Sequence, residues 1–298
     1  MARAAPQKSG DLLVAGHTII DRYWDVASLP QRDRTVPVEG VRVRLGGTAA
    51  NIARAAAGRG LRTALVGRVG DDFPEEFRAE LRASRLVLDG LETVRGARSP
   101  TCLIVEDGKG GQMTLIDQGA MDDESDAEVP LALLRNYPWV HLTTGDPNFQ
   151  LRLLAAARSG GARIAADPAQ EIHYRWNGPR LRKLLAGSEV FFGNEAETAA
   201  AVRLLSAGSA SRLTRHVPLV VVTRGRRGAR AYSRAGTVDA PGRKPRKLQQ
   251  VTGAGDSFRG GFYASYLRGA PLGDALTAGV AAAVEWIETA QFPRGRRG

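Results

Sequence analysis

Short apolar runs that end in glycine or in a polar residue recur along this chain and predict buried β-strands. In the second half of the sequence these runs alternate with segments of helical periodicity. The predicted strands there are 139–143, 163–166, 190–192 and 219–223, and the predicted helices are 148–158, 180–186, 195–205, 256–268 and 272–289. Because strands and helices alternate, we predict a parallel sheet with helices on both faces and an active site at the carboxyl ends of its strands.

The first half repeats this pattern but adds weaker strands. Its predicted buried strands are 12–16 and 63–69, and its predicted helices are 46–59 and 74–84. Segment 23–44 is interrupted by prolines and charges, and its alternating valines predict small, partly exposed strands. Residues 101–106 and 111–116 flank an Asp-Gly turn, which predicts a hairpin. The valines concerned are Val36, Val38, Val41 and Val43, and their exposure leads us to expect a homodimer formed through these strands.

Composition narrows the class of protein. The chain has 298 residues, of which 43% are hydrophobic, and is long enough to bury a substantial core. No stretch approaches the roughly 18 uncharged apolar residues that a membrane span needs, and the first ten residues lack the apolar core of a signal peptide. The single cysteine, Cys102, excludes an internal disulfide framework and a cysteine-built metal site. We therefore expect a cytoplasmic protein.

The net charge of +11 comes mostly from arginine and is concentrated in three clusters. These contain almost no aromatic residues, which favours a solvated basic surface over nucleic-acid binding. A third interpretation is that the first two clusters raise the local potential where a polyphosphate binds. The clusters are Arg224, Arg226, Arg227 and Arg230; Arg243, Lys244, Arg246 and Lys247; and Arg294, Arg296 and Arg297.

The most informative local pattern is a glycine-rich turn that runs into a predicted helix. Gly253, Ala254 and Gly255 let backbone N–H groups converge at a helix start, which predicts an anion-binding hole. The carboxylate of Asp256 is unexpected there, because it repels an anion. It is explained if Asp256 removes a proton from a hydroxyl that attacks a phosphate held by the amides. The alternative is an Asp that caps an ordinary helix.

Two motifs in the first half suit an alcohol ligand. Asp21, just past the first strand, can accept hydrogen bonds from two hydroxyls or can cap a turn. Gly46 and Gly47 let a ligand approach the backbone closely, and Asn51 follows in the first helical turns; plain helix entry is the alternative. His17 is a further candidate for substrate contact, whereas the other histidines are interpreted as structural.

Two motifs in the second half suit a nucleotide. Asn194 and Glu197 follow an apolar strand and share one helix face, where Glu197 could serve Mg²⁺ or both residues could form a capping box. The next strand is followed by a segment that offers a hydroxyl, guanidinium groups and glycine amides to phosphates or a ribose. Its candidate nucleotide-binding residues are Thr223, Arg224, Gly225 and Gly228. It has no Walker A lysine.

Together these motifs resemble those of the ribokinase-like (PfkB) carbohydrate kinase family over residues 11–290. The N-terminal signature is matched by residues 46–54, Leu61 and residues 66–72. The C-terminal signature is matched by residues 252–261, and Asn194-Glu195-Ala196-Glu197 matches the family's Asn-x-x-Glu motif. The order and spacing of the three motifs make the resemblance specific.

The resemblance implies a three-layer α/β/α sandwich with a mostly parallel central sheet and a small β-lid from about 18–44 and 97–118. The two ends of the sequence, 1–10 and 291–298, are predicted to be flexible tails. The resemblance also implies ATP-dependent phosphorylation of a hydroxymethyl group on a sugar or sugar derivative. Asp256 would be the base, and Gly253, Ala254, Gly255 and Asp256 the anion hole. Asn194 and Glu197 would organise Mg²⁺ and phosphates, Thr223 and Gly225 would line the ATP site, and Asp21, Gly46, Gly47 and Asn51 would bind the acceptor.

One departure from the family pattern concerns Gln250 and Val251, which stand where the signature usually has Asp-Thr. The missing carboxylate commonly helps to hold a monovalent cation, so activation by such a cation is doubtful here. The basic segment 243–247 is one candidate source of positive charge in its place. Two other functions stay open: a nucleoside kinase of the same family, and a sugar- or nucleotide-binding regulator without catalysis.

Overall fold

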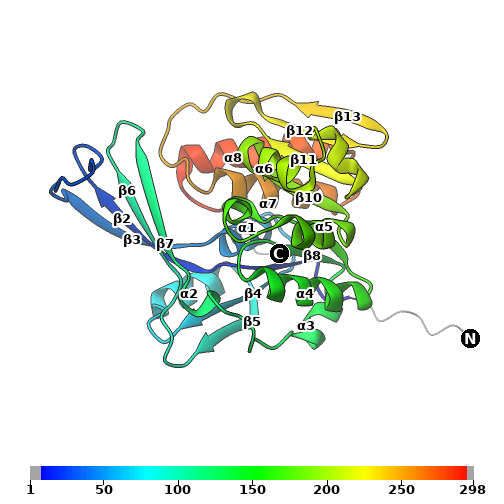
Figure 1. Cartoon of the computed structure of the whole chain (residues 1–298), viewed down its shortest axis with the longest axis horizontal. Helices are drawn as coiled ribbons and strands as arrows, with labels where there is room; N and C mark the ends of the chain where they lie inside the picture. Colours follow the sequence, from blue (N-terminus) through cyan, green and yellow to red (C-terminus); the bar gives the residue numbers. More distant parts are fainter. Residues whose placement is uncertain (1–7, 294–298) are drawn as a thin grey trace, which may run out of the picture.

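The computed structural model describes residues 8–293, and within them the strands form two sheets of very different size (Figure 1). The larger has nine strands in the order β13-β12-β11-β10-β9-β8-β1-β4-β5, and the smaller has four in the order β3-β2-β6-β7. Of the predicted tails 1–10 and 291–298, residues 1–7 and 294–298 lie outside the described residues, as does the basic cluster at Arg294, Arg296 and Arg297.

The large sheet confirms the predicted parallel core. Its strands are β1 (Leu12–Ala15), β4 (Thr63–Gly70), β5 (Val87–Val94), β8 (Trp139–Leu142), β9 (Arg163–Ala166), β10 (Val190–Asn194), β11 (Leu219–Thr223), β12 (Ala229–Ser233) and β13 (Gly236–Ala240). Seven neighbouring strands, β11, β10, β9, β8, β1, β4 and β5, pair in parallel, and β12 and β13 add an antiparallel edge. The sequence pattern did not reveal β5, β12 or β13.

Helices cover both faces of this sheet, because alternate side chains of its strands enter two separate cores. Leu12 and Val14 pack with one set of helices, and Leu13 and Ala15 with the other. The first set is α1 (Thr48–Ala57), α2 (Glu75–Ala83), α7 (Ala254–Tyr266) and α8 (Leu272–Thr289). The second set is α3 (Leu131–Arg135), α4 (Pro147–Ser159), α5 (Gly178–Ala186) and α6 (Glu195–Leu205). The α/β/α prediction is confirmed. Among residues 8–293, no helix is long and apolar enough to cross a membrane.

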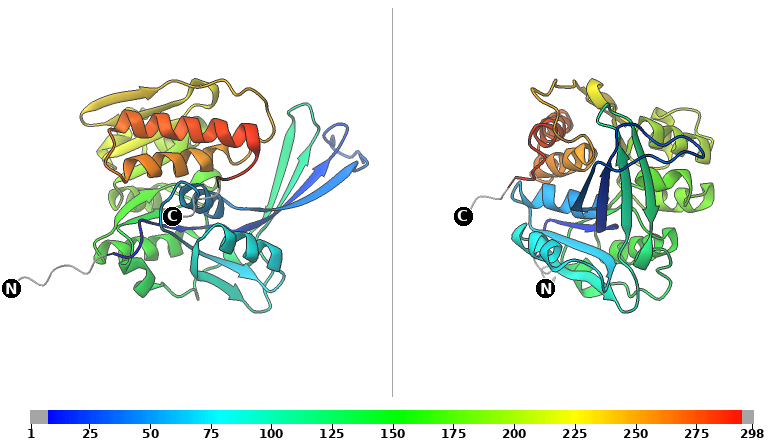
Figure 2. Two further views of the ribbon diagram at one scale, coloured as in Figure 1. Left: turned by 180° about the vertical axis from the view of Figure 1, so that it is seen from behind. Right: turned by 90° about the vertical axis from the view of Figure 1, so that its left-hand side faces the viewer.

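The small sheet projects from this body, as the three views of the ribbon show (Figures 1 and 2). It contains β2 (Ile19–Asp25), β3 (Gly40–Gly46), β6 (Thr101–Glu106) and β7 (Gln112–Asp117). The predicted hairpin is formed by β6 and β7, and Asp107 closes its turn by accepting hydrogen bonds from the N–H groups of Lys109 and Gly111.

The connections between the sheets place the site. The chain passes from the carboxyl end of β1 directly into β2, and from β3 directly into α1. Strands β1, β8, β9, β10 and β11 are neighbours and parallel, so their carboxyl ends all face the junction with the small sheet. The candidate site residues that follow the carboxyl ends of these strands therefore lie at this junction.

Candidate active site

The glycine-rich turn opens α7 as the sequence predicts. Gly253 adopts a φ of 91°, and the helix begins at Ala254. The N–H of Ala254 donates to the carbonyl of Val251, whereas those of Gly253, Gly255 and Asp256 have no partner within residues 8–293. Three unpaired donors at a helix start suit an anion.

Asp256 stands in the first turn of α7 and is half-buried. Its Oδ2 accepts a hydrogen bond of 3.0 Å from Nδ2 of Asn51, which lies on α1. Burial raises the pKa of Asp256 to about 7, although the guanidinium of Arg259 and the Asn51 hydrogen bond oppose the shift. A carboxylate with this pKa can accept a proton near neutral pH.

Four residues predicted to bind an alcohol meet beside Asp256. A Cβ on Gly46 would lie 1.9 Å from Oδ2 of Asp21, so only glycine leaves room for this carboxylate. Gly47 has a φ of 100°, and a Cβ there would lie 2.3 Å from the carbonyl oxygen of His17. Burial and the charge of Asp256 raise the pKa of Asp21 to about 7. Asp21, Asn51 and Asp256 thus form one polar group from three elements.

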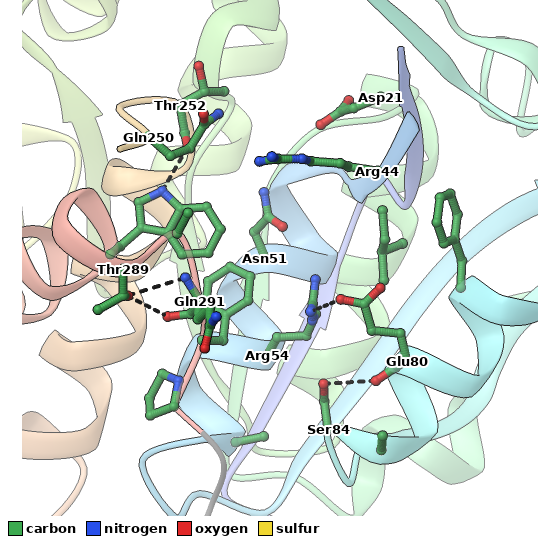
Figure 3. Close-up of a pocket in the computed structure, with 18 of the residues that line it drawn as sticks. Asp21, Arg44, Asn51, Arg54, Glu80, Ser84, Gln250, Thr252, Thr289 and Gln291 are labelled. Carbon is green, nitrogen blue, oxygen red and sulfur yellow. Dashed lines mark hydrogen bonds and ion pairs between the residues drawn. The ribbon is translucent and has the colours of Figure 1, made fainter. Parts of the chain in front are cut away.

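A cavity of about 930 Å³ opens from this group (Figure 3). Asp21, Arg44 and Asn51 lie toward one end, and Arg54, Glu80 and Ser84 toward the other. Apolar and aromatic side chains also line it, namely Tyr23, Leu45, Phe77, Trp286 and Phe292. The lining therefore combines apolar surface with many polar and charged groups.

Asn194 and Glu197 are held together at the carboxyl end of β10. The Asn194 side chain accepts from the N–H of Glu197 at 2.9 Å, and Oε2 of Glu197 accepts from the N–H of Asn194 at 2.7 Å. The capping box considered for the sequence is therefore present. Glu197 is buried, and burial raises its pKa. Within residues 8–293, no group of three His, Cys, Asp or Glu side chains could hold a metal.

The remaining nucleotide candidates lie next to this box. Strand pairing places Thr223 opposite Asn194, and Gly225 and Gly228 bound the following 3₁₀ turn. Arg224 and Arg230 form ion pairs with Asp239, and Arg227 pairs with Glu195. Much of this basic cluster is therefore neutralised within the protein.

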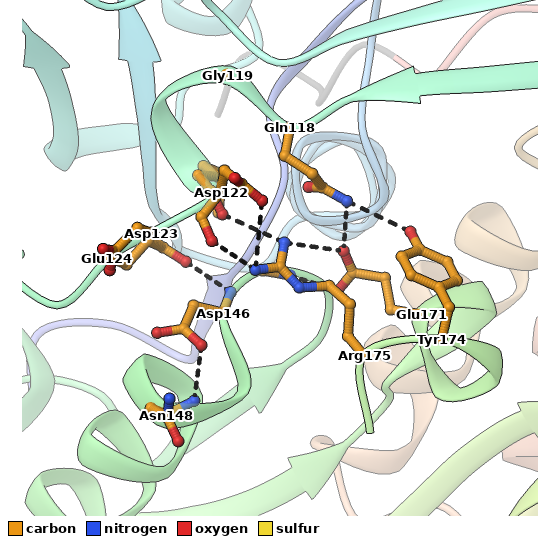
Figure 4. Close-up of polar contacts among 12 residues, drawn as sticks. Gln118, Gly119, Asp122, Asp123, Glu124, Asp146, Asn148, Glu171, Tyr174 and Arg175 are labelled. Atoms are coloured by element: carbon orange, nitrogen blue, oxygen red, sulfur yellow. Dashed lines mark hydrogen bonds and ion pairs between the residues drawn. The ribbon is translucent and has the colours of Figure 1, made fainter. Parts of the chain in front are cut away.

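A second polar cluster lies around Glu124, Asp146 and Glu171 (Figure 4), and its two buried glutamates had no sequence signal. Oε2 of Glu124 accepts from the N–H of Asp146 at 2.8 Å, and Oε2 of Glu171 accepts from the N–H of Gly145 at 2.7 Å. Burial raises the pKa of Glu124 to about 8 and that of Glu171 to about 7. Nε2 of His17 lies 4.0 Å from Glu171, and burial lowers the His17 pKa to about 4. These two buried carboxyl groups hold the loop after β8 in place. The sequence did not predict this role, because both residues stand among other polar residues.

The fold and this site define a class of protein: an α/β phosphotransferase whose acceptor is an alcohol group. The model of the pfkB family of carbohydrate kinases matches residues 9–291, so the chain belongs to that family. The protein is an ATP-dependent kinase that phosphorylates a hydroxyl group of a sugar or a nucleoside. The resemblance noted for the sequence is confirmed.

Relatives with known names agree with this class. The nucleoside kinase of Methanothermobacter thermautotrophicus is 34% identical over 264 residues, which are 88% of this chain and 84% of that protein. The ATP-dependent ribose-1-phosphate kinase of Halopiger xanaduensis is 29% identical over 257 residues, 86% of this chain and 84% of that one. The crystal structure of the Methanocaldococcus jannaschii nucleoside kinase, an archaeal member of the ribokinase family, has a TM-score of 0.86 at 27% identity and covers 94% of this chain and 92% of its own.

Proposed function

We propose that Asp256 is the general base of the phosphoryl transfer and that the Gly253–Asp256 turn is the anion hole. The half-buried carboxylate, its bond to Asn51 and the unpaired N–H groups around it support these roles. Asp256 takes the proton from the acceptor hydroxyl as the oxygen attacks the γ-phosphate of ATP, and the amides stabilise the transferring group. Asp21 and Asn51 orient the acceptor.

Asn194 and Glu197 are the proposed Mg²⁺ and phosphate partners, beside Thr223, Arg224, Gly225 and Gly228 as the nucleotide-binding residues. One buried carboxylate beside an amide fits an ion that usually keeps several waters and binds substrate phosphates. Mg²⁺ neutralises phosphate charge when it is bound. Glu197 would hold its water shell, and the capping box keeps that carboxylate at the end of β10.

The acceptor that the cavity supports best is a nucleoside, phosphorylated at its hydroxymethyl group. The cavity of about 930 Å³ beside Asp21 and Asn51 is the observation that carries this proposal. Its volume exceeds what one sugar ring fills, and Tyr23, Leu45 and Phe77 supply apolar surface for a base. The relatives named as nucleoside kinases support the same acceptor class.

Arg44 favours a second candidate, a phosphorylated sugar. Arg44 lies opposite Asp21 in the strand register and lines the cavity (Figure 3), and its guanidinium lies 5.7 Å from the centre of the Tyr23 ring. Within residues 8–293 it forms no ion pair, in contrast to Arg42, which pairs with Asp25 and Glu106. An unpaired guanidinium in an acceptor cavity suits a phosphate, and one relative is named as a ribose-1-phosphate kinase.

An acceptor panel combined with Arg44→Gln separates the two candidates. ADP release is measured with nucleosides, ribose, fructose, ribose 1-phosphate, phosphorylated hexoses and keto-deoxy sugar acids. For a nucleoside acceptor, we expect Arg44→Gln to change KM by less than about threefold. For a sugar phosphate, loss of one charged hydrogen bond raises KM by about 10- to 100-fold. Arg42→Gln, on the same face but already paired, is the matched control. Absence of activity with every acceptor would contradict both candidates.

The small sheet is proposed to act as a lid and as a dimer interface. Asp21 and Tyr23 share the inner face of the sheet, and residues in the alternate register share the outer face, of which Val43 and Leu45 also reach the cavity. Strand register places Trp24, Val41, Met113 and Leu115 on that outer face, and all four are exposed. An exposed apolar sheet face is expected to bind another protein surface, and a second copy offers the same apolar surface.

We expect the protein to sediment as a dimer and Leu115→Lys to sediment as a monomer, because the charge would be buried against the second copy. Val87→Lys is the control, since Val87 is an exposed valine on β5 of the large sheet. Analytical ultracentrifugation over a range of concentrations measures both variants. A monomeric parent protein, or a Leu115→Lys variant that stays dimeric, would exclude this interface.

A further inference from the structure

Arg259 is a buried cation beside the proposed anion hole. It lies one turn after Asp256 on α7 and is 5% exposed. Its Nε and Nη2 donate to the two carboxylate oxygens of Asp167, the latter at 2.7 Å. Its Nη1 donates to the carbonyl of Gly255 at 3.0 Å. The guanidinium is therefore fixed on both sides, by a strand end and by the turn itself.

Further buried groups hold Asp167 in place. Oδ2 of Asp167 lies 3.2 Å from Nε2 of His141, and Nδ1 of His141 lies 2.7 Å from the hydroxyl of Tyr263. All three side chains are fully buried. Burial opposes ionisation of Asp167, but Arg259 and His141 outweigh it and lower the pKa of Asp167. The pair of Arg259 and Asp167 is thus a charged one.

The positive end of this pair faces the reaction site. A Cβ on Gly255 would lie 3.1 Å from Nη1 of Arg259, so the guanidinium touches a glycine of the anion-hole turn. Burial raises the pKa of Asp256, and Arg259 opposes this shift more strongly than either Asp167 or Glu197 alone reinforces it. Within this pair, the guanidinium therefore affects the pKa of Asp256 more strongly than the carboxylate of Asp167 does.

We propose that Arg259 is a positioning residue, a permanent cation that fixes the Gly253–Asp256 turn and adds positive charge next to the transferring phosphoryl group. The inference rests on the catalytic roles proposed above. A buried ion pair contributes little net stability compared with apolar side chains, so its place beside the turn is better explained by electrostatics at the site. Asp167, at the end of β9, anchors the cation.

The buried charge of Arg259 also bears on Gln250 and Val251, the two positions at which this sequence departs from the Asp-Thr of the family signature. Nε2 of Gln250 donates to the hydroxyl of Tyr23 at 3.3 Å, and the basic segment 243–247 is largely exposed. Arg259, buried against Gly255 of the turn, is a source of positive charge that does not depend on that segment. We expect turnover in sodium, potassium and choline buffers of equal ionic strength to agree within about twofold. A several-fold activation by one cation would contradict a permanent charge that suffices alone.

Two variants test the proposal, with ATP and the best acceptor of the panel above. Arg259→Met keeps the length but removes the charge, and we expect kcat to fall about 10- to 100-fold while KM for ATP changes less than about threefold. Arg259→Lys, which keeps the charge, is expected to recover part of that loss. Tyr263→Phe removes only the far end of the network, and is expected to lower Tm while kcat is kept.

The double variant Arg259→Met/Asp167→Asn separates catalysis from folding. Arg259→Met alone leaves an unpaired buried carboxylate, so its Tm is expected to fall, whereas the double variant removes both charges and should recover Tm. We expect kcat of the double variant to stay low. Recovery of kcat together with Tm would show a purely structural pair and overturn the proposal. An active Asp256→Asn enzyme would instead contradict the catalytic assignment, which is a separate result.

Discussion

Replacing Asp256 with asparagine is expected to lower kcat by about 10³-fold, because the acceptor hydroxyl then has no base to take its proton. ATP binding should change little, since the anion-hole amides and the Asn194–Glu197 box are untouched. Isothermal titration with ATP and steady-state ADP release measure the two effects. Asp274→Asn is the matched control, because Asp274 holds the same place in the first turn of α8. Turnover that survives in Asp256→Asn would remove Asp256 from the role of base.

The pH dependence follows from the same carboxylate. Since the pKa of Asp256 is raised to about 7 and the base must be ionised, kcat/KM is expected to fall as pH decreases below about 7. The pKa of Asp21 is also raised to about 7, in part by the negative charge of Asp256. Because this repulsion is mutual, each carboxylate raises the pKa of the other. Asp21→Asn should therefore move the acidic limb to lower pH while it raises the acceptor KM. An unmoved limb would show that the two carboxylates titrate independently.

Stability should respond in the opposite sense to activity. A carboxyl whose pKa is raised on folding binds its proton more tightly in the folded state, so stability is lost as pH rises from about 4 to about 7. Asparagine at position 256 cannot ionise, so the variant does not lose this stability as pH rises. Thermal unfolding at pH 8 is therefore expected to give Asp256→Asn a Tm at least as high as that of the parent protein, a trade of stability for function.

Replacing Gly47 with alanine is expected to destabilise the protein by about 2–4 kcal/mol. The added Cβ would lie 2.3 Å from the carbonyl oxygen of His17 and 2.9 Å from the nitrogen of Ile19, and backbone atoms cannot turn aside. The first turn of α1 must then shift, and it carries Asn51, the partner of Asp256. We expect kcat/KM for the acceptor to fall in parallel.

Gly96→Ala is the control for this substitution. Gly96 also has a positive φ, 73°, but a Cβ there would meet no atom within 4 Å. The substitution should therefore lower the free energy of unfolding only by the strain of a left-handed backbone, about 1–2 kcal/mol, and should leave kcat/KM unchanged. Denaturant unfolding and ADP release report both quantities. Equal losses of stability and of activity in the two variants would show that the close approach at Gly47 is unimportant.

The parallel core was predictable because its strands are buried on both faces and read as continuous apolar runs. The strands that escaped notice are the two edge strands of the large sheet, β5 and β13, and β12, which lies next to β13. Strand β5 has no fully buried residue, and β13 has one, so neither leaves an apolar run in the sequence. Strand β12 alternates buried with half-buried positions and includes Arg230 and Tyr232. Edge strands are specified by their neighbours more than by their own residues.

The candidate site was predictable where glycines set the backbone. Gly46, Gly47 and the Gly253–Asp256 turn have sequence signatures because only certain residues fit there. The ion pair of Arg259 with Asp167 has no sequence signature, although Arg259 lies in a predicted helix and Asp167 directly follows a predicted strand. Helical periodicity tells which residues share a face of α7, but the strand end that this face meets depends on the order of the strands.

Asp21 belongs to the small sheet, whereas Asn51 and Asp256 belong to helices packed on the large one. An acceptor bonded to all three would join two separately built parts of the molecule. Its binding energy would then depend on how the small sheet is held, and linkage makes this dependence reciprocal. Any contact that biases the small sheet, including a second copy on its outer face, must change acceptor affinity by the same factor by which the acceptor changes that contact.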